Sequence, residues 1–230
     1  MSSEVRVMLH KVLGKALSLV LDHKNELDND LYAGVHFKVL GIRMGDDSRE
    51  NLKKWFILAL GPGWRAGPVP SLEKRQEAIR EFDKWYDDVK LRILNKYSEQ
   101  RALDEMYKTI DKIPTIGPKT AGVLLRDWIY HFKIWSELKN YLYLPIDRHV
   151  RNIIVNKLKA GEEIEVPKVG EDYLKDRNQD FQKELDEIHK PRVEFDYFWT
   201  IGNKFCSYNL CDICWLNSLC KQKETSYLYI

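Results

Sequence analysis

The chain has 230 residues, which is enough to bury a substantial core as one large domain or two small lobes. Hydrophobic residues make up 44% and charged residues 31%, a balance that excludes a disordered chain or a fibrous repeat. Charged residues interrupt the first 20 positions, and no stretch approaches the roughly 18 apolar residues of a membrane span, so neither a signal peptide nor a membrane contact is expected. The expected location is therefore cytoplasmic or otherwise intracellular.

The charge is unevenly distributed along the chain, although the net charge is only +2. Residues 108–159 contain ten basic and four acidic side chains, and residues 162–196 contain twelve acidic and six basic ones. A basic segment of this kind is typical of a nucleic-acid surface, while charge runs also occur on ordinary solvated faces. The distribution is therefore compatible with a nucleic-acid partner without requiring one.

Apolar spacing near 3.6 residues dominates the chain and alternating patterns are scarce, so we predict an all-α fold. Ser71 and Asp147 are expected N-caps, and the glycines and prolines of residues 61–68 must interrupt helical structure. The predicted helices, in chain order, cover residues 5–20, 51–60, 71–97 (as one helix or two), 103–110, 120–135, 147–158, 178–188 and 193–205.

The most informative motif is residues 113–121, which read I-P-T-I-G-P-K-T-A. Gly117 allows close approach of another group, and Pro118 suits the first turn of a helix, where its missing N–H costs nothing. The N–H groups at such a helix start form a natural phosphate site. Lys119 is then expected in the first turn, beside whatever the hairpin holds.

A second motif, L-P-I-D-R-H at residues 144–149, follows Lys119 after an interval of 28 residues to Asp147. A carboxylate can stabilise the positive charge that develops on a sugar when its glycosidic bond breaks. An amine at the same carbon can act as a nucleophile. Asp147 as an ordinary N-cap and Lys119 as a simple phosphate contact are the structural alternatives. His149 is expected to be structural or a phosphate contact.

Together these motifs resemble the helix-hairpin-helix DNA glycosylases of base excision repair. The resemblance implies a two-lobed helical fold and double-stranded DNA with a damaged base as partner. It implies Lys119 and Asp147 as catalytic residues, and it implies DNA contacts by Ile116, Gly117, Lys119, Thr120 and Arg148. Thr115 replaces a glycine that many members carry, which predicts a slightly reshaped hairpin.

The expected organisation is a single glycosylase unit over residues 1–230, acting as a monomer. One lobe is expected from about residue 30 to 160 and contains the hairpin at 113–121. The second lobe is expected from the N-terminal helix together with about 161–230. Arg65 is a candidate for a side chain that wedges into DNA, or an ordinary loop residue.

All four cysteines lie at residues 206–220 with the spacing C-x4-C-x2-C-x5-C. Such a cluster in an intracellular protein favours a metal centre over disulfides, and four thiolates suit a 4Fe-4S cluster or zinc. The segment around Cys206, Cys211, Cys214 and Cys220 is similar to the iron–sulfur loop of the endonuclease III-like and adenine-mismatch glycosylases, which have a longer first gap. We expect a 4Fe-4S cluster, with zinc as the alternative.

The resemblance implies a bifunctional DNA glycosylase and abasic-site lyase. The long interval before Asp147 resembles that of archaeal 8-oxoguanine glycosylases, and its aromatic residues could sandwich an extruded base or simply form core: Trp135, Tyr141 and Tyr143. The cysteine loop instead favours oxidised pyrimidines or mismatched bases. A third alternative is a DNA-binding module without catalytic activity, whose cysteines hold structural zinc.

Overall fold

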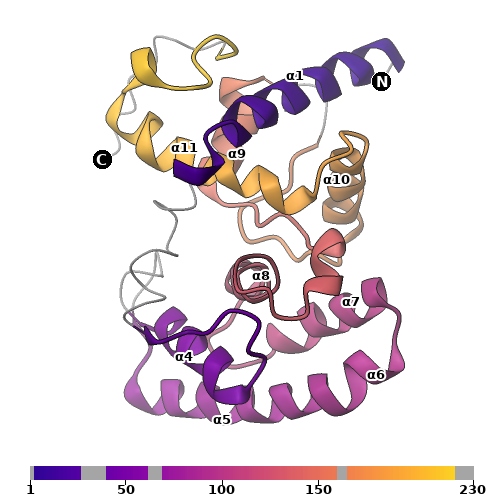
Figure 1. The fold of residues 1–230 in the computed structure, drawn as a ribbon, viewed down its shortest axis with the longest axis vertical. Helices are drawn as coiled ribbons and strands as arrows, with labels where there is room; N and C mark the ends of the chain where they lie inside the picture. Colours follow the sequence, from indigo (N-terminus) through magenta and orange to yellow (C-terminus); the bar gives the residue numbers. More distant parts are fainter. Residues whose placement is uncertain (1–2, 27–39, 62–68, 160–164, 221–230) are drawn as a thin grey trace. The chain divides into compact units, whose positions relative to one another are not determined.

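The computed structural model describes residues 3–26, 40–61, 69–159 and 165–220, with the side chains of residues 3–9 excepted. Within these ranges every regular element is a helix and no strand occurs (Figure 1). The all-α prediction is therefore confirmed. In the same part of the chain, no helix combines the length and the apolar character that a membrane span requires.

The chain forms two compact units. The hairpin unit comprises residues 32–143 and 172–174, and the terminal unit comprises residues 1–31, 144–171 and 175–230. The chain therefore passes from one unit to the other at Tyr143 and Leu144, whereas the lobes expected from the sequence met near residue 160. The difference arises because α9 (Arg148–Asn152) packs against α11 (Tyr197–Lys204), so the segment after Leu144 shares the core of the C-terminal helices.

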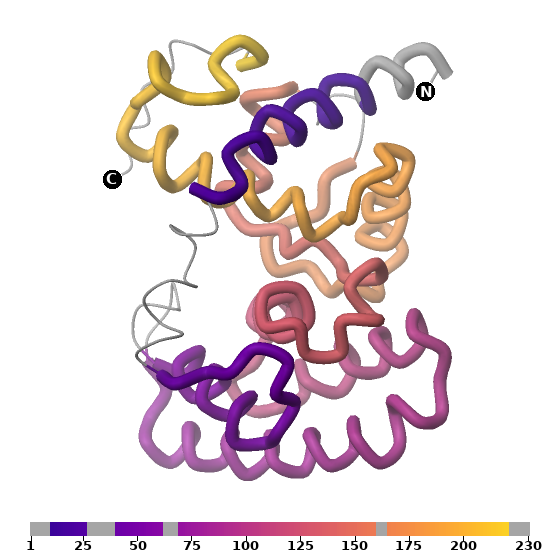
Figure 2. The backbone as a smooth tube through the Cα atoms, viewed as in Figure 1, coloured from indigo at the N-terminus to yellow at the C-terminus, as the bar shows by residue number. Residues whose placement is uncertain are grey.

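The hairpin unit contains a long rod in which α5, a π-helical stretch and α6 follow one another without a break, as the tube in Figure 2 shows. Ser71 caps the start of this rod, because its side chain accepts the N–H of Lys74, as the sequence predicted. The helical elements of the unit are α4 (Arg49–Ala59), α5 (Leu72–Asp88), η1 (Val89–Ile93), α6 (Leu94–Lys96), α7 (Glu99–Ile110), α8 (Pro118–Arg126), η2 (Asp127–His131) and η3 (Ser136–Tyr141).

The core of the hairpin unit is built from aromatic rings. Trp85 stacks on Trp128 with centroids 5.6 Å apart, and Phe56 stacks on Phe82 at 4.5 Å. Asp127 is buried here and accepts hydrogen bonds from Trp55 Nε1 and from Arg126. Burial raises the pKa of Asp127, and the Arg126 guanidinium opposes this shift. The ring contacts join α5 to α4 and to η2, and the hydrogen bond from Trp55 to Asp127 joins α4 to η2.

The helix after the hairpin is shorter than the predicted 120–135. It ends at His131, because Lys133 and Trp135 adopt positive φ angles of 59° and 53°, which no helix continues. The next predicted helix begins at Asp147 as expected and ends at Lys157, two residues before Lys159 takes up a φ of 53°. Gly161, its expected end, and Arg65, the wedge candidate, lie outside the described residues.

The terminal unit gathers both ends of the described chain. α1 contacts α11, and α11 leads directly into the cysteine-containing loop, drawn in yellow in Figure 1. Its helical elements are α1 (Ser3–Leu21), α9 (Arg148–Asn152), η4 (Ile153–Lys157), α10 (Asp176–Asp186), η6 (Arg192–Asp196), α11 (Tyr197–Lys204), η7 (Cys206–Tyr208) and η8 (Cys211–Ile213).

Candidate functional site

The hairpin is a tight turn over Ile113–Ile116, closed by the bond from Ile116 N–H to the Ile113 carbonyl at 3.0 Å. Pro114 occupies the second position and Thr115 the third, with a φ of 73°. Proline followed by a positive φ is the pattern of a type II turn, which normally takes glycine at the third position. Thr115 thus adopts a backbone conformation that normally favours glycine.

The first and last residues of the turn are buried in the core, whereas the position beside Gly117 is unoccupied by described atoms. Ile113 and Ile116 are 4% and 5% exposed. Gly117 is the N-cap of α8 with an extended φ of −109°, so neither its backbone angle nor a side chain cap explains a glycine here. Apart from Gly117 and its two chain neighbours, no described atom lies within 4 Å of the position that a Cβ on Gly117 would occupy. The space beside this helix start is therefore available to a group from outside the chain.

Lys119 and Thr120 occupy the first turn of α8, as the sequence predicted, and both are half-buried. Pro118 precedes them at the first helical position, where its fixed φ suits helix initiation. Ile116, Gly117, Lys119 and Thr120 therefore lie together at one end of α8. This is the part of the predicted DNA-binding set that the hairpin unit contains.

A cluster of three tyrosines packs against α8 at Gly122. Tyr173 stacks with Tyr143 and packs on Tyr107, with centroids 5.7 and 4.9 Å apart. Its hydroxyl lies so close to the backbone of Gly122 that a Cβ there would stand 2.0 Å from it. Burial raises the pKa of the Tyr107 phenol well above its ordinary value. No sequence signal singles out Gly122 or Tyr173, because the partner of a glycine inside a helix is known only from the tertiary structure.

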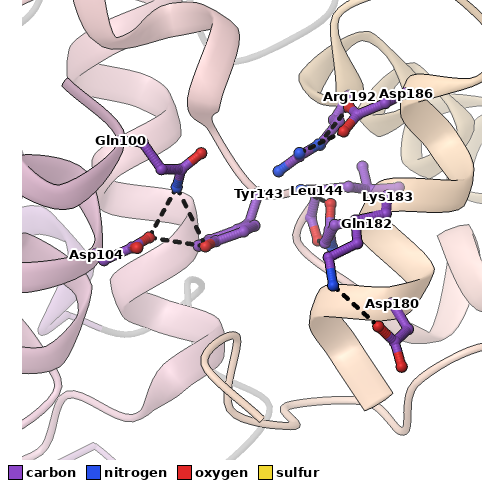
Figure 3. Close-up of polar contacts among 9 residues, drawn as sticks. All are labelled: Gln100, Asp104, Tyr143, Leu144, Asp180, Gln182, Lys183, Asp186 and Arg192. Carbon is purple, nitrogen blue, oxygen red and sulfur yellow. Dashed lines mark hydrogen bonds and ion pairs between the residues drawn. The ribbon is translucent and has the colours of Figure 1, made fainter. Parts of the chain in front are cut away.

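The aromatic residues of the interval before Asp147 belong to the core. Trp135 is 7% exposed and makes an edge contact with Trp85, 6.4 Å between centroids. Tyr143 is 4% exposed, and its hydroxyl donates to Asp104 at 2.7 Å, beside Gln100 (Figure 3). Of the two alternatives for these residues, the structure favours packing for Trp135 and Tyr143, whereas Tyr141 is half-buried.

Asp147 is the N-cap of α9 in the terminal unit. Its Oδ1 accepts the N–H groups of His149 and Val150 at 2.8 and 2.9 Å, which confirms the predicted cap, and the residue is 5% exposed. Arg148 is exposed, and its Nε lies 3.3 Å from His149 Nε2. His149 is buried against α11, where a Cβ on Gly202 would stand 2.6 Å from the His149 Cβ. His149 therefore has a packing role.

The predicted site residues are divided between the two units. The hairpin unit holds Ile116, Gly117, Lys119 and Thr120, and the terminal unit holds Asp147, Arg148 and all four cysteines.

The cysteine loop is a folded, docked segment. Phe205 and Leu216 are 4% and 2% exposed, and Trp215 packs edge-on against Phe205. The indole of Trp215 also stacks on the ring of His23 after α1, with centroids 4.0 Å apart and an angle of 2°. The ammonium of Lys204 lies 5.9 Å from the Trp215 ring centroid. These contacts attach the loop to α1 and α11, and no sequence motif indicated them.

All four cysteines are half-buried, and none of them forms a disulfide. Burial raises the pKa of Cys206 to about 11, the other three thiols add to this shift, and the buried cation of Lys157 opposes it. Burial also raises the pKa of Cys214. The sulfurs thus interact electrostatically, although no three Cys, His, Asp or Glu side chains in the described ranges are grouped closely enough to hold a metal ion.

Comparison of the chain with protein-family models, with curated proteins and with solved structures gave no match.

Proposed function

We propose that the protein is a bifunctional DNA glycosylase and abasic-site lyase that removes an oxidised base, with 8-oxoguanine favoured as substrate. The observation that carries the proposal is the open start of α8. There Gly117 leaves space for a ligand, and Lys119 occupies the first helical turn. A phosphate bound at these N–H groups would bring a DNA backbone to the amine of Lys119. The sequence around Asp147 supplies the second group that the reaction requires.

In the proposed reaction, the Lys119 amine forms a bond to C1′ of the damaged nucleotide as the N-glycosidic bond breaks. The base leaves with the electron pair of that bond and takes up a proton. Opening of the sugar ring gives an iminium, or Schiff base, between Lys119 and C1′. Loss of a C2′ proton then breaks the C3′–O bond and cleaves the strand, and water releases the lysine.

Asp147 would stabilise the positive charge that develops on the sugar as the base departs. Its Oδ1 is fixed by two backbone N–H groups, so the carboxylate is held in one orientation without depending on the ligand. A preorganised anion of this kind costs no reorganisation when the charge appears. The exposed Arg148 beside it is suited to a phosphate contact.

The four cysteines are the proposed ligands of a 4Fe-4S cluster. All four sulfurs come from one short loop, and four thiolates are the donor set of a 4Fe-4S centre. In the described residues they are not grouped closely enough to hold a metal ion, so binding of a cluster would have to draw them together. A cluster bound there would supply a rigid link across residues 206–220. Lys157 would place a positive charge beside the anionic thiolates.

The decisive experiment incubates the purified protein with duplexes that carry 8-oxoguanine, thymine glycol, uracil or an abasic site, scoring base release and strand cleavage separately. Borohydride should trap a protein–DNA adduct with the wild type and not with Lys119→Gln. Lys112→Gln, which alters an exposed lysine just before the hairpin, is the matched control and should trap normally. Trapping that persists in Lys119→Gln would reject Lys119 as the nucleophile.

The same assay separates the alternatives. Release of 8-oxoguanine supports the favoured substrate, whereas release of thymine glycol alone supports an endonuclease III-like specificity. Binding to all duplexes without base release or trapping supports a DNA-binding module. A broad absorbance band at about 400 nm would indicate iron–sulfur, and metal analysis that finds only zinc would replace the cluster by a structural zinc site.

A further inference from the structure

The segment that leads to Asp147 is held by a single buried side chain of α10. Gln182 Oε1 accepts the backbone N–H of Leu144 at 2.9 Å, and Gln182 Nε2 donates to the carbonyl of the same residue at 3.2 Å (Figure 3). Both residues are fully buried. The amide of Gln182 therefore pairs with Leu144 as a neighbouring β-strand residue would.

The pairing is necessary because Leu144 precedes a proline. Pro145 has no N–H and confines Leu144 to an extended conformation, so the chain here cannot form its own helical hydrogen bonds. The N–H and carbonyl of Leu144 are nevertheless buried, and an unpaired buried peptide group is costly. Gln182 satisfies both groups with one side chain.

Further hydrogen bonds fix the orientation of Gln182. Its Nε2 also donates to Asn178 Oδ1 at 3.1 Å, and Asn178 Nδ2 donates to the Glu171 carbonyl at 3.2 Å. One acceptor and two donor hydrogens of the Gln182 amide are thus engaged, so the amide cannot be reversed without losing all three bonds. A further hydrogen bond holds the same segment at Ile146, whose carbonyl accepts the N–H of Gly170 at 3.4 Å.

We propose that Gln182 is a positioning residue for Asp147, fixing the extended segment 144–146 so that the carboxylate is presented in one place at the start of α9. The inference rests on the proposed function, since it assigns Asp147 the role described above. Asp147 follows Leu144 by three residues, and its own backbone is extended, with a φ of −106°. Its bonds to His149 and Val150 orient the carboxylate relative to α9, and the Gln182 pair fixes the chain that enters α9.

Loss of the Gln182 pair should therefore affect base removal more than DNA binding. A displacement of a catalytic group by about 1 Å can cost about 100-fold in rate. We expect Gln182→Leu to lower the single-turnover rate of base release by roughly 10- to 100-fold, with the dissociation constant for damaged duplex changing less than about threefold. Borohydride trapping on a preformed abasic site, which needs no base departure, should fall much less.

A second variant tests the hydrogen-bond geometry itself. A neutral glutamic acid in Gln182→Glu has one acceptor and one O–H donor and can reproduce the pair with Leu144, whereas the ionised form has acceptors only. The rate of base release relative to the wild type at each pH should therefore rise as the pH falls. Taking the ratio to the wild type cancels the titrations that are the same in both proteins.

Leu185→Ala is the matched control, because Leu185 lies on the same buried face of α10 and has no part in the pair with Leu144. The Leu185→Ala variant shows how much a loss of packing in α10 changes the rate of base release when the Gln182 pair is intact. Thermal unfolding of all variants shows which of them are folded. Equal rates of base release in Gln182→Leu and Leu185→Ala, or a Gln182→Glu ratio that is independent of pH, would overturn the positioning role. Absence of base release and trapping in the wild type would instead overturn the proposed function.

Discussion

The two candidate catalytic side chains are held in different ways. In the hairpin unit, Lys119 is placed by backbone conformation and packing: a turn with Thr115 at positive φ, two buried isoleucines and a helix pressed against Tyr173. In the terminal unit, Asp147 is placed by hydrogen bonds, two to its own carboxylate and two more between Leu144 and Gln182.

This difference has consequences for how each region tolerates substitution. Close packing fails when a single methyl group is added, because a buried neighbour has nowhere to move. A hydrogen-bonded position tolerates an isosteric change that preserves the bonds, even when charge is removed. Substitution at the hydrogen-bonded Asp147 should therefore change function without changing stability, whereas substitution at a packed position of the hairpin unit should lower stability.

The largest expected effect comes from Asp147→Asn. Asparagine is as good an N-cap as aspartate, so the free energy of unfolding should change by less than about 1 kcal/mol. The rate of base release should fall by about 100- to 1,000-fold, because the negative charge near the sugar is lost. Chemical denaturation and single-turnover kinetics check the two parts, and a variant that keeps the wild-type rate would remove Asp147 from the catalytic proposal.

Gly122→Ala tests the packed side of the comparison. The new Cβ would stand 2.0 Å from the Tyr173 hydroxyl, and Tyr173 is only 3% exposed. We expect the free energy of unfolding to fall by about 1–3 kcal/mol, measured by denaturant titration. If Gly122→Ala is as stable as the wild type, the tyrosine cluster does not fix α8, and the distinction between the two units is lost.

Gly117→Ala provides the contrast within the same segment. No described atom lies near the added methyl and the φ of Gly117 is extended, so stability should be unchanged. Binding to damaged duplex should weaken about tenfold, since a Cβ would hinder a charge-assisted bond to phosphate. Fluorescence anisotropy at fixed salt measures this, and an unaltered affinity would mean that the open space beside α8 is not the phosphate site.

The smallest expected effect is that of Thr115→Gly. A residue other than glycine in the left-handed conformation costs roughly 1–2 kcal/mol, which the substitution relieves. The greater conformational freedom of glycine in the unfolded chain lowers the stability of the variant by about 0.5–1 kcal/mol and so offsets part of this gain. The variant should therefore be more stable by about 0.5 kcal/mol, which replicate thermal unfolding scans can detect. A loss of stability would show that the half-buried Thr115 side chain contributes more than the strain of its backbone.

Local sequence predicted much of the fold, because helices are determined by periodicity and by residues at their ends. The caps at Ser71 and Asp147, the helices after them and the turn before α8 follow from signals within a few residues. The helix predicted to reach residue 135 was too long, since Lys133 and Trp135 have positive φ angles and Trp135 packs against Trp85, which local periodicity does not reveal.

The residues that support the candidate site were harder to predict from the sequence. For one of them, Gln182, the sequence did carry a signal. On α10 the buried face has the spacing of a helical stripe and is formed by Asn178, Phe181, Gln182 and Leu185. Two amides on an otherwise apolar stripe are a signal that buried polar partners exist. Nothing in the sequence indicated that the partner of Gln182 is Leu144, or that Tyr173 lies against Gly122.

The sequence by itself determined the helical class, the hairpin with Lys119, the cap at Asp147 and the grouping of the cysteines, because each depends on residues a few positions apart. Only the tertiary structure decided that the chain leaves the hairpin unit at Tyr143 and that the interval aromatics Trp135 and Tyr143 are core. It also decided that Gln182 holds the segment before Asp147. Contacts between distant residues arise from packing and from the pairing of buried polar groups, and a local pattern specifies neither.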